Sequence, residues 1–120
     1  ETDKMGVVYH SNYFIWFEVG RVHMLAEIDL PYHAIESAGY GLPVLEAHAK
    51  FLRPARFDDL VVVQATMRES PGIRLQIEYD VSCGIRLLCQ GYTLHAFVNS
   101  EGKPSRPPGE MIDRMRRYFE

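Results

Sequence analysis

Near the start of the chain stands Asp3-Lys4-Met5-Gly6-Val7-Val8-Tyr9-His10-Ser11-Asn12-Tyr13, which runs directly into the apolar segment 14–28. Apolar residues in that segment recur at steps of three and four, which predicts a helix with one buried face. Ser11 or Asn12 has the short polar side chain that caps such a helix at its N-terminus. An acid, a glycine and a helix start therefore follow one another in an order that suggests chemistry at the helix start.

The predicted helix start is suited to binding negative charge. Its first backbone N–H groups lack partners within the helix and lie at the positive end of the helix dipole, so they can stabilise an anion or a developing oxyanion. Asp3, on the far side of the loop that contains Gly6, can face the same point. One carboxylate and a set of oriented N–H donors are the minimum for acyl transfer to water.

The rest of the chain predicts a second short helix and then a sheet. Pro31 ends the first helix, and the second spans 32–38, closed by Gly39 or Gly41. Strands are predicted over 42–53, 60–68, 73–81 and 86–99, and an amphipathic helix follows Pro107-Pro108. One long helix followed by four antiparallel strands indicates the α+β class.

Two of these strands carry specific packing expectations. In 42–53 one alternating set indicates a half-buried strand, whose alanines would let a helix approach closely. The segment 86–99 is apolar or small on both faces, which predicts a central strand covered on both sides. The alternating set of the first strand consists of Leu45, Ala47, Ala49 and Phe51.

Composition limits the possible functions. A chain of 120 residues predicts a single domain over 1–120, and a net charge of −3 argues against a general nucleic-acid binder. Neither a membrane-spanning apolar run nor a signal peptide is evident, so the cytoplasm is the expected location. Cys83 and Cys89 fit a reducing compartment, and a turn near 83–85 would keep them from pairing across a hairpin.

The opening motif, continued by Trp16-Phe17-Glu18 and Arg21, resembles the signature of hotdog-fold acyl-CoA thioesterases of the 4-hydroxybenzoyl-CoA thioesterase family. The block 51–60 resembles the strand, turn and strand of the same family. The resemblance implies a hotdog fold, in which an antiparallel sheet wraps around one long central helix. It further implies sheets joined edge to edge in a homodimer or homotetramer, with active sites at the interface. Family members normally have a strand ahead of the acidic motif, so the first strand is expected to be missing from this sequence.

The same resemblance implies an acyl-CoA thioesterase that acts on an acyl-CoA or on an acyl carrier protein thioester. Asp3 is the expected general base for water, or the nucleophile that forms a mixed anhydride. His10 is expected to contribute its backbone N–H to the oxyanion rather than its imidazole. No cofactor is expected, and no metal, because the remaining histidines and the cysteines lack the spacing of metal ligands.

Five residues are candidates for substrate binding, and each also has a structural interpretation. Glu18 can line the acyl pocket or pair with Arg21 on the helix surface. Aromatic residues at helical spacing can shape a pocket or belong to the core. Arginines that flank a proline turn can hold coenzyme A phosphates or remain solvated. The candidates are Tyr9, Tyr13, Glu18, Arg53 and Arg56.

Two other functions are compatible with these residues. A dehydratase of the same fold would use a catalytic acid–base pair, commonly a histidine with an acid, and would depend on His10. A non-catalytic module would bind acyl thioesters without releasing a thiol.

Overall fold

The computed structural model describes residues 11–56, 59–68 and 72–116 of the chain. Every element predicted from the sequence is present within four residues of its expected bounds. The opening segment Asp3 to His10 lies outside the described residues. The elements are α1 (Ser11–Glu27), α2 (Tyr32–Ser37), β1 (Val44–Phe51), β2 (Val62–Thr66), β3 (Arg74–Cys83), β4 (Arg86–Ala96) and α3 (Gly109–Arg116).

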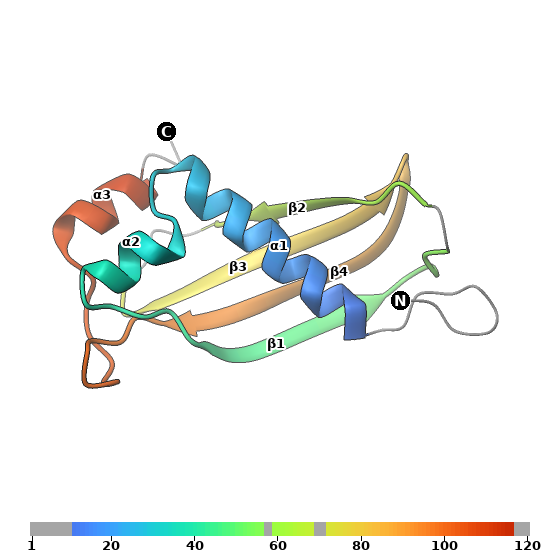
Figure 1. The fold of residues 1–120 in the computed structure, drawn as a ribbon. Coiled ribbons are helices and arrows are strands. Elements are labelled where there is room, and N and C mark those ends of the chain that lie inside the picture. Colours follow the sequence, from blue (N-terminus) through green and yellow to red (C-terminus); the bar gives the residue numbers. More distant parts are fainter. Residues whose placement is uncertain (1–10, 57–58, 69–71, 117–120) are drawn as a thin grey trace.

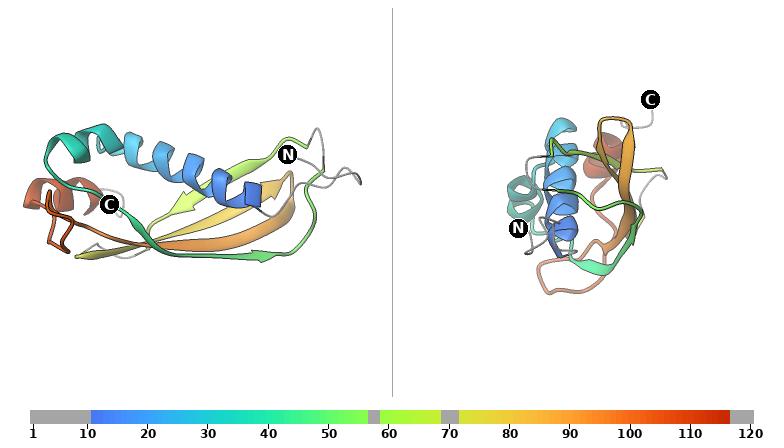
Figure 2. Two further views of the ribbon diagram at one scale, coloured as in Figure 1. Left: turned by 60° about the horizontal axis from the view of Figure 1, so that its bottom comes forward. Right: turned by 90° about the vertical axis from the view of Figure 1, so that its right-hand side faces the viewer.

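The four strands form one antiparallel sheet in the order β1-β4-β3-β2. The α1 helix crosses one face of the sheet, and its first turn lies beside the end of β1 (Figure 1). The α2 and α3 helices lie at the opposite end of the sheet (Figures 1 and 2). The expected α+β class, with a long helix against an antiparallel sheet, is confirmed, and so is the central place of β4.

Glycines allow α1 to approach the sheet closely. The ring of Phe17 stacks on Tyr79 of β3, with 4.5 Å between ring centroids and 7° between planes. A Cβ atom at Gly91 of β4 would lie 2.6 Å from the Phe17 ring and 2.3 Å from the carbonyl oxygen of His48. Only a residue without a side chain fits there, since such contacts are well inside van der Waals distance.

The expectation of a half-buried β1 is wrong. Phe51 is 37% exposed although it lies on the face that turns toward α1, and Leu45, which falls at a register shift in the β1–β4 pairing, is 48% exposed. The reason is that α1 packs chiefly over β2 and makes few contacts with β1. Of the two alanines expected to admit the helix, Ala49 packs against the core and Ala47 stays exposed.

The expectation that β4 is covered on both faces is also wrong for the single chain. On the face opposite α1, Gln90 is exposed and Tyr92 is half-buried.

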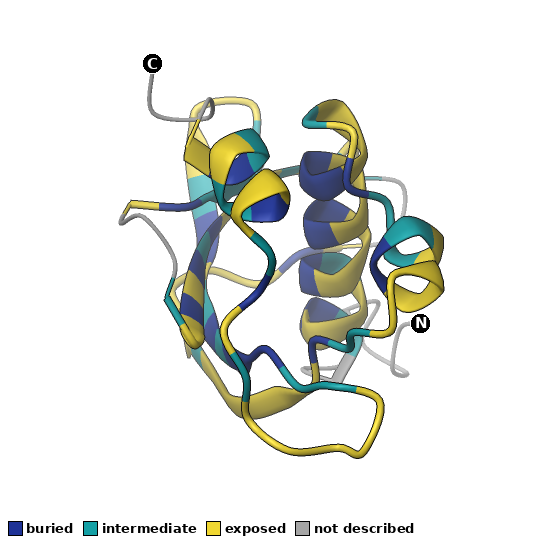
Figure 3. Ribbon diagram, turned by 90° about the vertical axis from the view of Figure 1, so that its left-hand side faces the viewer, coloured by how far each residue is buried: buried dark blue, intermediate teal, exposed yellow. Residues whose placement is uncertain are grey.

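The outward side of α1 is also exposed, and Figure 3 shows the exposed colour along that side of the helix. Exposed apolar residues along it are Phe14, Ile15, Val19 and Val22.

Cys83 and Cys89 do not lie opposite each other in the hairpin, as predicted. Cys83 is opposite Arg86 and Cys89 is opposite Val81 in the β3–β4 pairing, and both thiols are free. Burial raises the pKa of Cys89 to about 11. Among the described residues, no helix is long and apolar enough to cross a membrane.

Candidate functional site at the start of α1

Tyr13 holds the start of α1 against the turn that follows β1. Its side chain is 2% exposed, and its hydroxyl accepts a hydrogen bond of 3.2 Å from the backbone N–H of Ala55. Its ring makes edge contacts with Trp16 and Phe51, at centroid distances of 4.9 and 5.1 Å. Burial raises the pKa of Tyr13, so the hydroxyl stays protonated at neutral pH. One buried side chain thereby connects the N-terminal turn of α1, the end of β1 and the turn beyond it.

The turn after β1 presents two arginines on a fixed backbone. The N–H groups of Leu52 and Arg53 donate to the carbonyl of Leu88 at 2.8 and 3.1 Å. The N–H of Arg56 donates to the Asp59 carboxylate at 2.8 Å. Both arginine side chains are exposed, and within the described part of the chain their guanidinium groups form no ion pair.

This arrangement can bind anions. The N-terminus of a 17-residue helix presents N–H donors and the positive end of the helix dipole. Arg53 and Arg56 flank Ala55, to which that helix start is bonded through Tyr13. A ligand with a developing oxyanion at the helix and phosphates further out would meet positive charge at both places.

The candidate residues divide into three groups. Asp3, Tyr9 and His10 lie outside the described residues, so their roles stay predictions. The structure brings Tyr13, Arg53 and Arg56 to one end of the molecule, with Tyr13 in the core rather than on a pocket wall.

Glu18 forms the third group and is exposed on α1. The alternative expectation, that Glu18 pairs with Arg21 on the helix surface, is wrong. Arg21 is 7% exposed and points into the core, where its Nε donates to the Tyr32 hydroxyl at 2.8 Å. A terminal nitrogen of the same guanidinium donates to the Tyr79 hydroxyl at 3.0 Å. The Glu18 carboxylate is therefore left on the helix surface.

Sequence reasoning missed the buried polar network that begins at Arg21. The Tyr79 hydroxyl lies 2.6 Å from the Thr93 hydroxyl, which lies 2.8 Å from Nε2 of His95. Nδ1 of His95 lies 3.1 Å from the carbonyl oxygen of Leu42. A signal was present, because Arg21 falls four residues from both Phe17 and Leu25 on the apolar side of the helix.

Burial lowers the pKa of His95 to about 4, so this histidine is neutral at pH 7. Its two ring nitrogens are both engaged in the network, and it lies inside the core rather than in a cleft. We therefore assign His95 a structural role. Among the described residues, no group of three or more histidine, cysteine or acidic side chains could hold a metal ion.

Comparison with known proteins defines the class. The sequence profile of the Thioesterase-like superfamily matches residues 1–115, and the chain belongs to that family. The Thermus thermophilus protein TT1821 superposes with a TM-score of 0.90 at 35% identity, covering 98% of this chain and 88% of that one. The DHNA-CoA thioesterase of Staphylococcus aureus superposes with a TM-score of 0.90 at 25% identity, covering 99% and 83%. The hotdog thioesterase class expected from the sequence is thus confirmed.

Two bacterial proteins are similar over part of their length. YneP of Bacillus subtilis is 31% identical over 81 residues, which cover 68% of this chain and 59% of YneP. The acyl-CoA thioester hydrolase YbgC of Escherichia coli O6:H1 is 29% identical over 75 residues, which cover 62% of this chain and 56% of YbgC. The matched stretches thus span a little more than half the length of these relatives.

Proposed function

We propose that the protein hydrolyses acyl-CoA thioesters to a free acid and coenzyme A. Family membership and the activity in the name of YbgC support this reaction. The structural observation that carries it is the attachment of the α1 start, through Tyr13 and Ala55, to a turn with two exposed arginines. A thioester with a phosphate-rich leaving group needs both an oxyanion site and cationic contacts.

In the proposed mechanism Asp3 acts on the thioester carbonyl. As a general base it takes a proton from water, whose oxygen adds to the carbonyl carbon; as a nucleophile it forms a mixed anhydride that water then hydrolyses. The backbone N–H of His10 and its neighbours at the helix start stabilise the oxyanion. Collapse of the tetrahedral intermediate breaks the C–S bond and releases the coenzyme A thiolate.

The remaining candidates bind the substrate in this proposal. Arg53 and Arg56 contact the coenzyme A phosphates, because the planar guanidinium matches phosphate oxygens. Tyr9 and Glu18 border the acyl group, whereas Tyr13, which is buried, fixes the start of α1 against the turn after β1. The Staphylococcus aureus neighbour is named a DHNA-CoA thioesterase, so DHNA-CoA is one substrate to test. An acyl carrier protein thioester is an alternative substrate.

We further propose that the protein works in the cytoplasm as a homodimer or homotetramer joined edge to edge. Leu45 and Phe51 of β1, an edge strand of the sheet, are 48% and 37% exposed, which supports a second chain beside this strand. Two apolar side chains left exposed next to a free strand edge are typical of an interface.

Thiol release from aryl- and alkyl-CoA thioesters tests the reaction. Asp3→Asn should lower turnover at least about a hundredfold while leaving the melting temperature unchanged, because the substitution removes charge and little volume. Asp113→Asn is the matched control, since Asp113 is an exposed acid on α3, and it should release thiol at the wild-type rate. Equal rates for Asp3→Asn and wild type would refute the role of Asp3.

The arginines are tested with two leaving groups. Arg53→Ala and Arg56→Ala should each raise KM for an acyl-CoA about tenfold, and should not change KM for the same acyl group on pantetheine, which lacks phosphates. Arg106→Ala, at an exposed position in the loop before α3, controls for net charge. An equal rise in KM for both substrates would show that the arginines do not bind phosphate.

A further inference from the structure

The hairpin between β3 and β4 adds a third arginine to the end of the molecule at which α1 starts. Arg86 is the first residue of β4, and the hairpin lies at the same end as the first turn of α1 (Figure 1). The side chain of Arg86 is 51% exposed, and its guanidinium lies 4.0 Å from the carboxylate of Asp59, beyond hydrogen-bond distance. Within the described residues Arg86 forms no other ion pair, so its N–H donors are available to a ligand.

Asp59 connects Arg86 to the turn that carries the other two arginines. The carboxylate oxygen of Asp59 that approaches Arg86 also accepts the backbone N–H of Arg56, at 2.8 Å. Asp59 donates its own backbone N–H to the carbonyl of Arg56 at 3.1 Å. These two bonds fix Asp59 to the turn, and its carboxylate holds the guanidinium of Arg86 near the same turn. Arg53, Arg56 and Arg86 are thereby gathered at one end of the described chain.

Arg86 lies farther out than the start of α1. Phe51, whose ring contacts that of Tyr13 at 5.1 Å, is opposite Cys89 of β4. Arg86 precedes Cys89 by three residues, which corresponds to about 10 Å along the strand. In coenzyme A the pantetheine arm separates the sulfur from the phosphates, so phosphate contacts are expected at a distance from the oxyanion site. The position of Arg86 meets this condition.

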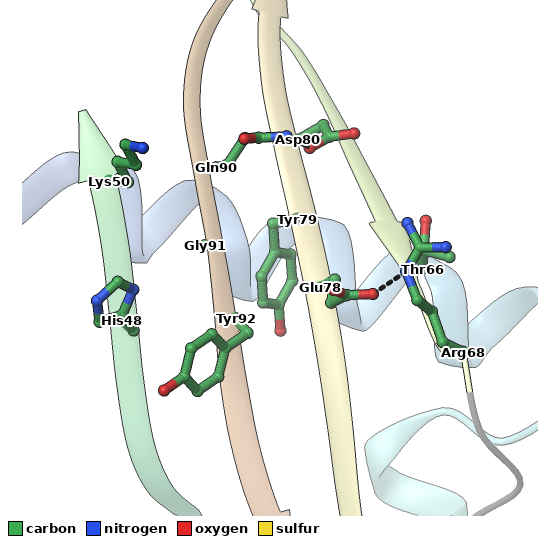
Figure 4. Close-up of a pocket in the computed structure, with 10 residues that line it drawn as sticks. All are labelled: His48, Lys50, Thr66, Arg68, Glu78, Tyr79, Asp80, Gln90, Gly91 and Tyr92. Atoms are coloured by element: carbon green, nitrogen blue, oxygen red, sulfur yellow. Dashed lines mark hydrogen bonds and ion pairs between the residues drawn. The ribbon is translucent and has the colours of Figure 1, made fainter. Parts of the chain in front are cut away.

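A second polar region of the sheet lacks such an excess of positive charge. The face opposite α1 contains a shallow hollow of about 330 Å³, and Figure 4 shows the side chains that line it. Lys50 and Arg68 supply two positive charges there, and Glu78 and Asp80 supply two negative charges. Arg68 and Glu78 form an ion pair. Because these charges balance, the hollow does not attract a phosphate-rich ligand as the arginine end does.

We propose that Arg86 binds the ribose 3′-phosphate of the coenzyme A leaving group, while Arg53 and Arg56 contact its diphosphate. This role rests on the proposed function, because it takes coenzyme A as the leaving group. A ribose separates the 3′-phosphate from the diphosphate, and the hairpin and the turn after β1 supply cations on two separate elements. A phosphate accepts the paired N–H donors of a guanidinium, so it replaces the distant Asp59 carboxylate as the partner of Arg86.

This role of Arg86 selects between the two kinds of thioester that the proposed reaction allows. An acyl carrier protein holds its acyl group on phosphopantetheine, which has a phosphate but no ribose 3′-phosphate. Arg86 therefore has a ligand in an acyl-CoA and none in the prosthetic group of a carrier protein. The residue thus favours coenzyme A thioesters as substrates.

Titration calorimetry with free coenzyme A and with 3′-dephospho-coenzyme A tests the role of Arg86 without requiring hydrolysis. Wild type should bind coenzyme A about tenfold more tightly than the dephospho form, as expected for one charge-assisted contact. Arg86→Ala should bind coenzyme A about tenfold more weakly than wild type does, and the dephospho form with wild-type affinity. Arg86→Lys should recover part of the loss, because lysine keeps the charge but lacks the planar pair of donors.

Two further variants are controls. Arg106→Ala removes the same charge from an exposed position in the loop before α3, and it should keep the wild-type preference for coenzyme A. Arg53→Ala should weaken the binding of both ligands equally, since both contain the diphosphate. Equal affinity of wild type for the two ligands, an unchanged preference in Arg86→Ala, or no binding of either ligand would overturn the role of Arg86.

Thiol release from the thioesters of the same two ligands separates this proposal from the proposed reaction. Hydrolysis of both thioesters with the same KM would overturn the role of Arg86 and leave the proposed function in place. A calorimetric preference for coenzyme A that is lost in Arg86→Ala, without any thiol release, would support Arg86 as a phosphate-binding residue and overturn the proposed hydrolysis.

Discussion

Arg21 of α1 donates a hydrogen bond of 3.0 Å to the hydroxyl of Tyr79 on β3, and both side chains are buried. A guanidinium inside the core is costly unless its donors are bonded. Here its partners are two hydroxyls, those of Tyr79 and Tyr32, rather than a carboxylate. The bond therefore connects the long helix to the sheet through a polar contact in an otherwise apolar layer.

Tyr79→Phe should destabilise the chain by about 2 kcal/mol, the usual cost when a hydrogen bond to a charged group is lost. The substitution keeps the ring stacked on Phe17 but leaves both Arg21 and Thr93 without this hydroxyl. Urea denaturation measures the free energy of unfolding. Tyr92→Phe is the control, because Tyr92 lies on the face of the sheet opposite α1. This substitution should change the free energy of unfolding by less than about 0.5 kcal/mol. Equal stability of Tyr79→Phe and wild type would show that Arg21 does not need this bond.

Tyr13→Phe should lower the free energy of unfolding by about 1–2 kcal/mol, because the buried N–H of Ala55 would lose its acceptor. The aromatic contacts with Trp16 and Phe51 would remain, so the fold should persist. If the α1 start is the oxyanion site, kcat should fall more than KM rises, since the helix start would lose a fixed contact with the turn. Unchanged kcat together with lower stability would leave Tyr13 with a role in folding alone.

Gly91→Ala should destabilise the chain by about 3 kcal/mol or more, because the added Cβ would overlap the His48 carbonyl and the Phe17 ring. Gly109→Ala is the control, since a Cβ there meets open space. Phe17→Leu in the Gly91→Ala background should recover only part of the loss. The His48 carbonyl belongs to the backbone of β1 and cannot move aside as a side chain can. A soluble, fully stable Gly91→Ala would contradict the close approach of α1 to β4.

His95 should make the chain less stable in acid. Its pKa is lowered by burial to about 4 in the folded chain, against 6.5 ordinarily. As the pH falls, His95 is therefore protonated in the unfolded chain before it is protonated in the folded chain. The contribution of His95 to the free energy of unfolding is lost between about pH 6.5 and 4. From pH 7 to pH 5 the loss amounts to about 2 kcal/mol.

The measurement is urea denaturation of wild type and His95→Gln at pH 7 and pH 5. His95→Gln will be less stable at pH 7, but it should lose about 2 kcal/mol less than wild type between the two pH values, because glutamine does not titrate. Identical losses in the two proteins would mean that His95 is not held neutral by burial. Acidic groups contribute equally to both proteins, so their effect cancels in the comparison.

Periodicity in the sequence was sufficient to predict the order of the elements, and their bounds to within four residues. The three- and four-residue spacing over 14–28 and the alternation over 73–81 correspond to α1 and β3 because each pattern reflects the local geometry of the backbone. The order of residues around Asp3 and Ser11 was sufficient to predict the family, which the superfamily match confirms. The roles of Asp3, Tyr9 and His10 stay predictions, since these residues lie outside the described part of the chain.

Only the tertiary structure decided what covers each face. The alternation in β1 correctly places Ala47, Ala49 and Phe51 on one face, while Leu45 falls at a register shift. A period of two does not say whether a helix lies over that face, and α1 lies over β2 instead. From its charge alone Arg21 would be expected at the surface. It is buried because the hydroxyls of Tyr32 and Tyr79, which are distant in sequence, accept its hydrogen bonds. By itself the sequence determined the elements, whose geometry is local; their pairing and coverage arise from contacts between distant segments, which local patterns do not contain.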